Sequence, residues 1–174
     1  IDDMIKTMYK IICWALSLVL FVACQPQTQK AKHLGEDKQL DSIMMAQLEL
    51  NTHFAEAADY DCSAFVQSDS LEYAMDDSGF WYTKTIVTSN DTIQRGQEVS
   101  LHLQISELRG ALLSDVKHHH VVGNGELPIA ITRSIKMMSI GEQMHIVAPW
   151  YTAYGVEGTT IIKPYSNLLI IICI

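Results

Sequence analysis

Clusters of histidine, aspartate and glycine are the first places in this sequence where chemistry could be expected. His118-His119-His120 could bind a metal ion, Asp76-Asp77-Ser78-Gly79 has the look of a calcium loop, and Gly123-Asn124-Gly125 could belong to a phosphate loop. No cysteine or carboxylate cluster accompanies the histidines, and adjacent residues of a strand point to opposite faces. The acidic segment lacks the further oxygens of a calcium loop, and no Gly-Lys-Ser/Thr follows the glycines. We therefore expect an exposed histidine loop and two turns, with no metal and no cofactor.

An aromatic group near the carboxyl end is the remaining candidate for chemistry. Trp150 and Tyr151 stand close to Tyr154, and this cluster could equally pack in a core or contact a substrate. The surrounding pattern predicts elements in a fixed order. These are an amphipathic helix at 132–138, a turn at Gly141, an apolar strand, an aromatic loop ending in Ala153-Tyr154-Gly155, and a last apolar strand at 168–173 that we expect to be central.

The residues that precede this segment are predicted to form strands. Apolar and polar residues alternate over 82–87 and 99–106, which is the period of a strand, and a further strand is expected at 111–116. Ser89-Asn90-Asp91 and Arg109-Gly110 supply the turns between them. His102 then points outward, and we expect it, like His145, at the surface.

This order resembles that of the FKBP-type peptidyl-prolyl cis/trans isomerases over residues 79–174. The resemblance rests on Gly96, Val99, His102, Gly110, Ile135, Met138, Gly141-Glu142, Pro149, Ala153-Tyr154-Gly155, Gly158, Ile161-Ile162 and Pro164. It implies an α+β fold, an FKBP-like antiparallel half-barrel sheet of about five strands wrapped on one helix and preceded by N-terminal helices. The pattern is similar to a bacterial lipoprotein subgroup associated with gliding motility.

The resemblance implies a cleft for proline rather than a set of reactive groups. Rotation about a peptide bond must cross about 18–20 kcal/mol, but no covalent bond changes partner. An apolar cleft and a few donors therefore suffice. The positions carried over as catalytic are Tyr154, Leu103, Leu113, Ile131, Ile162 and Ile170, and those carried over as substrate-binding are Val121, Leu127, Pro128, Ile161 and Trp150. The Tyr154 hydroxyl would be the donor to a substrate carbonyl.

Several of these positions depart from the family. Leu103 replaces a tyrosine, Leu113-Ser114 replaces Phe-Asp with Asp115 one place late, Ile131 replaces an indole, Ile170 replaces a common phenylalanine, and Lys163-Pro164 replaces Pro-Pro. The walls stay hydrophobic, but a carboxylate that helps fix the cleft is lost. We expect an isomerase of reduced activity that assists the folding of exported proteins. The alternative is a non-catalytic chaperone-like or scaffold module that binds proline-containing segments through the same cleft.

Composition excludes one class of partner. The chain has 174 residues, of which 48% are hydrophobic, enough for one packed domain with some extra length. Its formal net charge is −8, and its lysines and arginines form no cluster. Nucleic acid binding depends on clustered positive side chains, so we exclude nucleic acid as a partner.

The amino-terminal pattern indicates a bacterial lipoprotein signal peptide. Lys6 and Lys10 precede an uncharged run that ends at Ala23, and Cys24 follows. We expect residues 1–23 to be removed and Cys24 to carry lipid, which would anchor the protein in the bacterial cell envelope, facing the periplasm. The alternative is an uncleaved membrane helix. Residues 24–36 are polar and are expected to form a flexible tether.

Residues 37–77 are expected to form one long or two shorter helices and a short helical segment at 71–75, ahead of a domain at 78–174. Apolar residues recur at spacings of three and four: Leu40, Ile43, Met44, Leu48, Phe54, Ala55, Ala58, Cys62 and Phe65. The stripe is expected to pack on the domain, while the resemblance leaves a homodimer through these helices open. A disulfide between Cys62 and Cys173 is possible in the periplasm but not expected, because nothing in the pattern brings them together.

Overall fold

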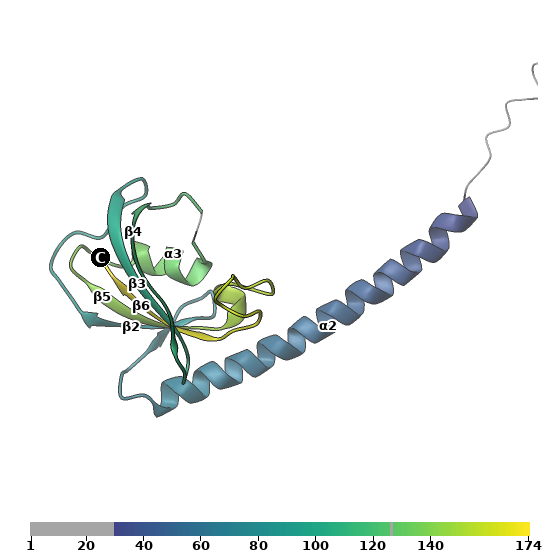
Figure 1. Ribbon diagram of the computed structural model, residues 1–174, viewed down its shortest axis with the longest axis horizontal. Helices are drawn as coiled ribbons and strands as arrows, with labels where there is room; N and C mark the ends of the chain where they lie inside the picture. The colour runs from purple at the N-terminus through teal and green to yellow at the C-terminus, as the bar shows by residue number, and fades with distance from the viewer. Residues whose placement is uncertain (1–29, 126) are drawn as a thin grey trace, which may run out of the picture. The chain divides into compact units, whose positions relative to one another are not determined.

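The computed structural model describes the backbone of residues 30–125 and 127–174, and the side chains from Leu40 onward within those ranges (Figure 1). The predicted signal peptide, Cys24 and the first part of the tether lie outside these residues. The chain divides into two compact units, one up to Ala46 and one from Gln47 to Ile174. The second unit holds every predicted cleft residue and, within the described ranges, every strand.

A mixed-order antiparallel sheet forms the body of the second unit. Its strands are β1 (Ala74–Met75), β2 (Trp81–Ile86), β3 (Glu98–Glu107), β4 (Leu112–Val121), β5 (Gln143–Ala148) and β6 (Leu168–Cys173). They lie in the order β1-β2-β5-β6-β3-β4, and all neighbours pair antiparallel. The last strand of the chain is therefore central, as its apolar run predicted, and lies between β5 and β3.

Helix α3 (Ile129–Lys136) packs on one face of this sheet and closes the core (Figure 1). Alternate residues of the strands point toward it because successive side chains of a strand face opposite sides. The buried side chains of this core include Leu101, Leu103 and Ile105 of β3, Leu168, Ile170 and Ile172 of β6, and Ile131 and Ile135 of α3. The helix starts earlier than predicted, directly after Pro128, whose backbone is extended and which supplies no amide to the first turn.

Helix α2 (Lys30–Ser68) is one continuous helix that begins inside the range predicted as tether. In the second unit its Ala58 and Cys62 are buried, so this part packs on the domain as expected. Leu40, Ile43 and Leu48 are instead exposed by 57%, 59% and 60%. No helix in the described part of the chain is long and apolar enough to cross a bilayer.

Two local predictions were wrong. The segment at 71–75 is not helical, because Ala74 and Met75 pair with β2 and form β1. The three histidines do not form a loop but extend β4 alongside β3, where His118 pairs with Leu101 and His120 with Val99. The predicted turns at Asp76 and Gly123 are present, the first closed by a hydrogen bond from the Ser78 amide to Asp76 Oδ1 (2.8 Å).

Candidate functional site

The floor of the predicted cleft is made by four apolar side chains that meet in the core. Leu103 comes from β3, Ile170 from β6 and Ile131 from α3, and their exposed fractions are 2%, 0% and 0%. Ile162, from the loop before β6, joins the same cluster at 2%. The structure thus brings these predicted residues together, but as a closed aliphatic floor whose atoms have little surface left for a ligand.

The accessible part of the site lies at the rim of this floor. Leu113, Leu127 and Tyr154 pack against the core while remaining partly exposed. A cavity of about 470 Å³ opens there, lined by Leu127, Pro128, Ala153, Tyr154, Gly155, Val156 and Glu157. Three predicted residues, Leu127, Pro128 and Tyr154, therefore share one concave surface that is mostly apolar, as small binding sites usually are.

Tyr154 and Glu157 contribute the polar side chains that line this cavity, and Tyr154 supplies its neutral donor. Burial raises the pKa of its hydroxyl, and no charge or hydrogen bond from another described residue contributes to the shift. The phenol therefore stays protonated near neutral pH and can donate a hydrogen bond into the cavity. Tyr154 was predicted as the donor, and its position on the rim is compatible with that role.

The loop that carries Tyr154 is tied by its own backbone. The Gly155 amide donates to the Trp150 carbonyl (2.9 Å), and the Gly158 amide donates to the Tyr154 carbonyl (3.1 Å). Farther along, the Thr159 hydroxyl accepts a hydrogen bond from the Ile162 amide (3.0 Å), and the Ile162 side chain points into the core. These bonds fix the backbone of the loop on both sides of Tyr154 and at Ile162.

Three residues predicted to bind substrate lie elsewhere. Val121 is 44% exposed at the end of β4, and Ile161 is 56% exposed because its neighbour Ile162 takes the inward position. Trp150 is buried, but its indole N–H donates to the Phe54 carbonyl of α2 (3.2 Å). None of the three lines the cavity at Tyr154.

The carboxylate that the resemblance implies for this region is turned away from the floor. Ser114 pairs with the buried Ile105, whereas Asp115 pairs with Gln104 on the opposite face. There Asp115 accepts from Gln104 (3.0 Å) and bonds to His102 Nε2 (2.6 Å), and these bonds lower its pKa. His102 faces outward as predicted, and the one-residue displacement of the aspartate removes it from the site.

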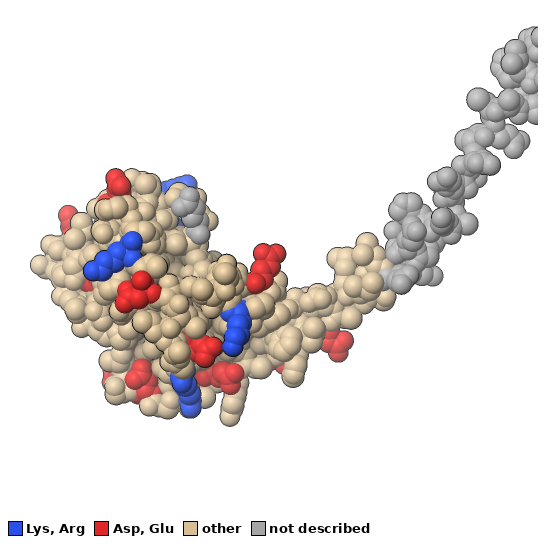
Figure 2. All heavy atoms as spheres, in the orientation of Figure 1, with Lys and Arg blue, Asp and Glu red and all other residues tan. Residues whose placement is uncertain are grey.

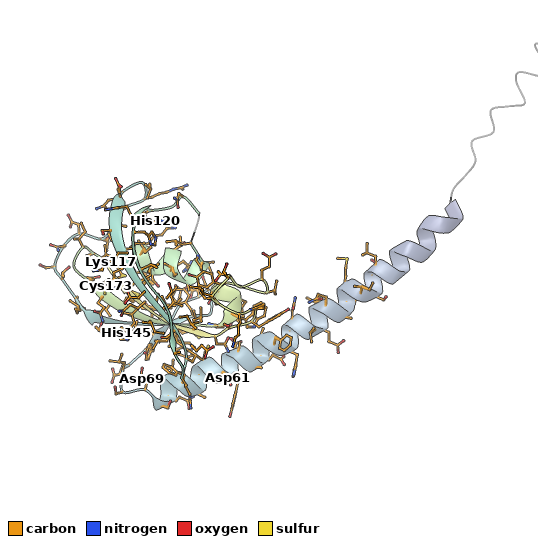
Figure 3. The ribbon with its side chains drawn as sticks, in the orientation of Figure 1. Asp61, Asp69, Lys117, His120, His145 and Cys173 are labelled. Atoms are coloured by element: carbon orange, nitrogen blue, oxygen red, sulfur yellow. The ribbon has the colours of Figure 1, made fainter. Side chains whose placement is uncertain are left out.

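Sequence reasoning missed a pair of histidines on the inner face of β4. His118 and His120 are two residues apart and therefore share a face, with ring centroids 6.3 Å apart. His120, which is labelled in Figure 3, is only 5% exposed. Extending the predicted strand beyond residue 116 would have found them. Among the described residues, no group of three or more histidine, cysteine or acidic side chains is arranged to hold a metal ion.

A larger cavity lies away from the predicted site residues. A second cavity of about 590 Å³ lies between α2 and the ends of β3 and β6, lined by Tyr60, Asp61, Ala64, Glu107, Leu108, Arg109, Ser166 and Asn167. None of the predicted site residues lines it. On the face drawn in Figure 2, lysine and arginine side chains are scattered among acidic ones and form no continuous patch.

Comparison with solved structures identifies the fold. AtFKBP13 aligns with a TM-score of 0.54 and 21% identity, over 59% of this chain and 95% of that one. A peptidyl-prolyl cis-trans isomerase from Pseudomonas syringae aligns with a TM-score of 0.56 and 18% identity, over 68% and 92%. FkpA from Escherichia coli aligns with a TM-score of 0.59 and 16% identity, over 94% and 79%.

These likenesses establish that the chain has an FKBP-like fold. No family model matches the sequence, and no curated protein matches it. The predicted α+β architecture, an antiparallel sheet wrapped on one helix, is confirmed.

Proposed function

We propose that the protein is a peptidyl-prolyl cis/trans isomerase of the FKBP type. The observation that carries this proposal is the cavity at Tyr154, where a mostly apolar rim that also includes Glu157 places the neutral Tyr154 hydroxyl beside a buried aliphatic floor. Proteins with the same fold include an isomerase of this class.

In this proposal the cavity acts on the planarity of the X–Pro amide. Leu127 and Pro128 hold the proline ring in apolar surroundings, which disfavour the dipolar planar form of the amide. The Tyr154 hydroxyl donates to the substrate carbonyl and binds the twisted form better than the planar one. One such hydrogen bond contributes about 1 kcal/mol, or roughly fivefold in rate, against a barrier of about 18–20 kcal/mol.

We expect the activity to be weak. The floor at Leu103, Ile131 and Ile170 is closed, so a proline ring can reach only the rim. Asp115 is engaged on the opposite face of the sheet and does not order the cleft. The same two observations favour a second candidate, a non-catalytic chaperone-like or scaffold module that holds proline-containing segments in this cavity.

We propose further that the protein works at the bacterial cell envelope. The support is the sequence pattern that ends at Cys24, which predicts a lipid anchor facing the periplasm. Its clients would then be exported proteins that fold outside the cytoplasm. The similarity to gliding-motility lipoproteins belongs to this proposal and rests on the relaxed first half of the motif.

A protease-free isomerisation assay on a short proline peptide tests the enzyme. At micromolar protein we expect acceleration by the wild type and about a fivefold loss of kcat/KM in Tyr154→Phe. Tyr60→Phe is the matched control, because Tyr60 is 73% exposed and lies outside the cavity. Absence of acceleration by the wild type would reject catalysis. Peptide-induced NMR shifts at Leu127 and Tyr154 would then decide for the binding module, and their absence would reject both.

A further inference from the structure

We propose that helix α2, from Asn51 to Asp59, is a brace that positions the loop carrying Tyr154. The residues concerned all lie in the unit from Gln47 to Ile174. The loop runs from Trp150 to Asn167, between β5 and β6, and includes Tyr154 and Ile162 of the candidate cleft. The brace is a property of the fold, and its consequence for activity rests on the proposed function.

Three side chains of the loop segment bond to this stretch of the helix. The Tyr165 hydroxyl donates to Asn51 Oδ1 (2.9 Å), and the Trp150 indole N–H donates to the Phe54 carbonyl (3.2 Å). The Tyr151 hydroxyl donates to the Asp59 carboxylate. These bonds join residues that are about a hundred positions apart in the chain, so they fix the loop to a separate element rather than to itself.

Aromatic packing fills the space between these hydrogen bonds. The Tyr165 ring lies between Phe54 and Trp150, with centroid separations of 4.7 Å and 4.9 Å. Trp150 also meets Tyr151 edge-on at 5.6 Å. Such tilted arrangements are the favoured geometry of aromatic pairs. The helix thus contributes one wall of a small aromatic cluster, and the loop contributes the others.

Tyr165 has an unfavourable backbone conformation, which the aromatic cluster stabilises. Its φ is 58°, and among the described residues it is the one residue other than glycine with a positive φ. A bulky side chain rarely adopts this left-handed conformation, and such strain persists only where the surroundings impose it. The surroundings here are Phe54, Trp150 and the hydrogen bond to Asn51, two of which belong to α2.

Tyr165 is one hydrogen bond away from the cleft. Its amide donates to the Gly155 carbonyl (3.2 Å), and Gly155 directly follows Tyr154. The Gly155 amide in turn donates to the Trp150 carbonyl (2.9 Å). A change at Asn51 would therefore reach Tyr154 through Tyr165 and Gly155. Tyr165 and Asn51 are positioning residues in this account, because neither lines the cavity.

Amide hydrogen exchange in the full chain tests the brace independently of enzymatic activity. In Asn51→Ala and in Tyr165→Phe, which removes the hydroxyl but keeps the ring, we expect the amides of Gly155 and Tyr165 to exchange about fivefold faster. The amides of Leu103 and Ile170, which lie in paired strands, should keep their rates. Asn51→Asp retains the Oδ1 acceptor and should restore the rates of the wild type.

The outcomes separate the brace from general stability and from the proposed function. Unchanged exchange at Gly155 overturns the proposal, and so does acceleration that extends equally to the sheet. In the isomerase assay, Asn51→Ala should lower kcat/KM about threefold, mainly by raising KM, and Asn51→Asp should restore it. Unchanged kinetics together with faster exchange of the loop amides would overturn the positioning role. A wild type without isomerase activity rejects the proposed function, and the exchange rates then decide the brace alone.

Discussion

Lys84 Nζ and Glu142 Oε2 lie 2.7 Å apart and join β2 to the turn before β5. The Glu142 side chain is only 2% exposed, and it also accepts hydrogen bonds from the amides of Ser139 (2.9 Å) and Thr88 (3.2 Å). The glycine before it has a φ of 88° and ends the segment after α3. The Gly141-Glu142 pair, one of the pairs on which the resemblance rests, therefore fixes the connection from helix to sheet.

Replacement of Lys84 by methionine should destabilise the domain. The change keeps the length of the side chain but leaves the Glu142 carboxylate buried without its cation, which should cost about 2 kcal/mol of unfolding free energy. Urea unfolding followed by circular dichroism at neutral pH measures this loss. Lys136→Met is the control, because Lys136 is exposed on α3, and it should change the free energy by less than about 0.5 kcal/mol. Equal effects of the two changes would contradict the prediction.

Acid should weaken the same connection. Burial alone would raise the pKa of Glu142, but the hydrogen bonds from Lys84, Ser139 and Thr88 outweigh it and hold the pKa below its ordinary value of 4.5. A carboxyl with a lowered pKa in the folded state stabilises the fold above its unfolded pKa, and this contribution disappears as the pH falls through the folded pKa. Unfolding free energy measured between pH 7 and pH 3 should therefore fall below about pH 4.5, and Glu142→Gln should flatten that dependence. An identical slope in the variant would rule out Glu142 as its source.

Local sequence patterns were enough to predict the main strands and their buried faces. Alternation along 99–106 identified the buried face of β3, and the apolar run at 168–173 identified a central strand. Glycines were informative where the backbone needs a positive φ, as at Gly141. Such signals arise within a few residues of one another, and therefore a single sequence contains them.

The parts that escaped prediction depend on contacts between distant segments. The hydrogen bond from Tyr165 to Asn51 spans 114 positions, and no local period of either segment indicates it. The sequence left Trp150 open between core packing and substrate contact, and no local pattern indicates that its indole N–H donates to α2. The predicted strand at 111–116 was shorter than β4, because Lys117 and the three histidines show no alternation of apolar and polar residues. In the structure, pairing with β3 extends the strand over these residues.

Two glycines of the cleft loop should respond differently to alanine. Gly155 and Gly158 have φ values of 69° and 64°, so both changes carry the cost of a left-handed alanine, about 1 kcal/mol. A Cβ on Gly155 meets nothing within 4 Å, whereas one on Gly158 would lie 2.3 Å from the Ile162 carbonyl oxygen. Because backbone must move to relieve that overlap, Gly158→Ala should cost roughly 2 kcal/mol more than Gly155→Ala. Thermal unfolding of both variants gives the comparison, and equal losses would show that the loop yields freely.

A carboxylate placed on the inner face of β4 should strengthen the candidate site. Ser114 lies on the side of Ile105 and the floor, at the position where the resemblance implies an aspartate. Ser114→Asp should raise kcat/KM for a proline peptide several-fold and lower stability by about 1 kcal/mol, because the charge is partly buried. Ser114→Asn has the same shape without the charge and should give no gain. A gain in both variants would assign the effect to size rather than to the carboxylate.

We propose that α2 also forms a homodimer interface. Leu40, Ile43, Met44 and Leu48 are spaced to share one side of the helix, and their exposed fractions are 57%, 59%, 61% and 60%. A row of large apolar side chains open to water favours association with a second copy of the same helix, where each row covers the other. Light scattering of a fragment that begins at Gln25 should therefore give twice the mass of one chain at micromolar concentration.

The decisive comparison uses two glutamates on the same stretch of helix. Ile43→Glu places a charge within the apolar row and should give a monomer. Ser42 is exposed and lies two positions from both Leu40 and Met44, on the opposite side of the helix, so Ser42→Glu adds a charge away from the row and should leave the dimer intact. Dissociation by both changes would assign the effect to net charge, because repulsion between acidic chains does not depend on the side of the helix. A strictly monomeric wild type would remove the interface and leave the row without a partner chain.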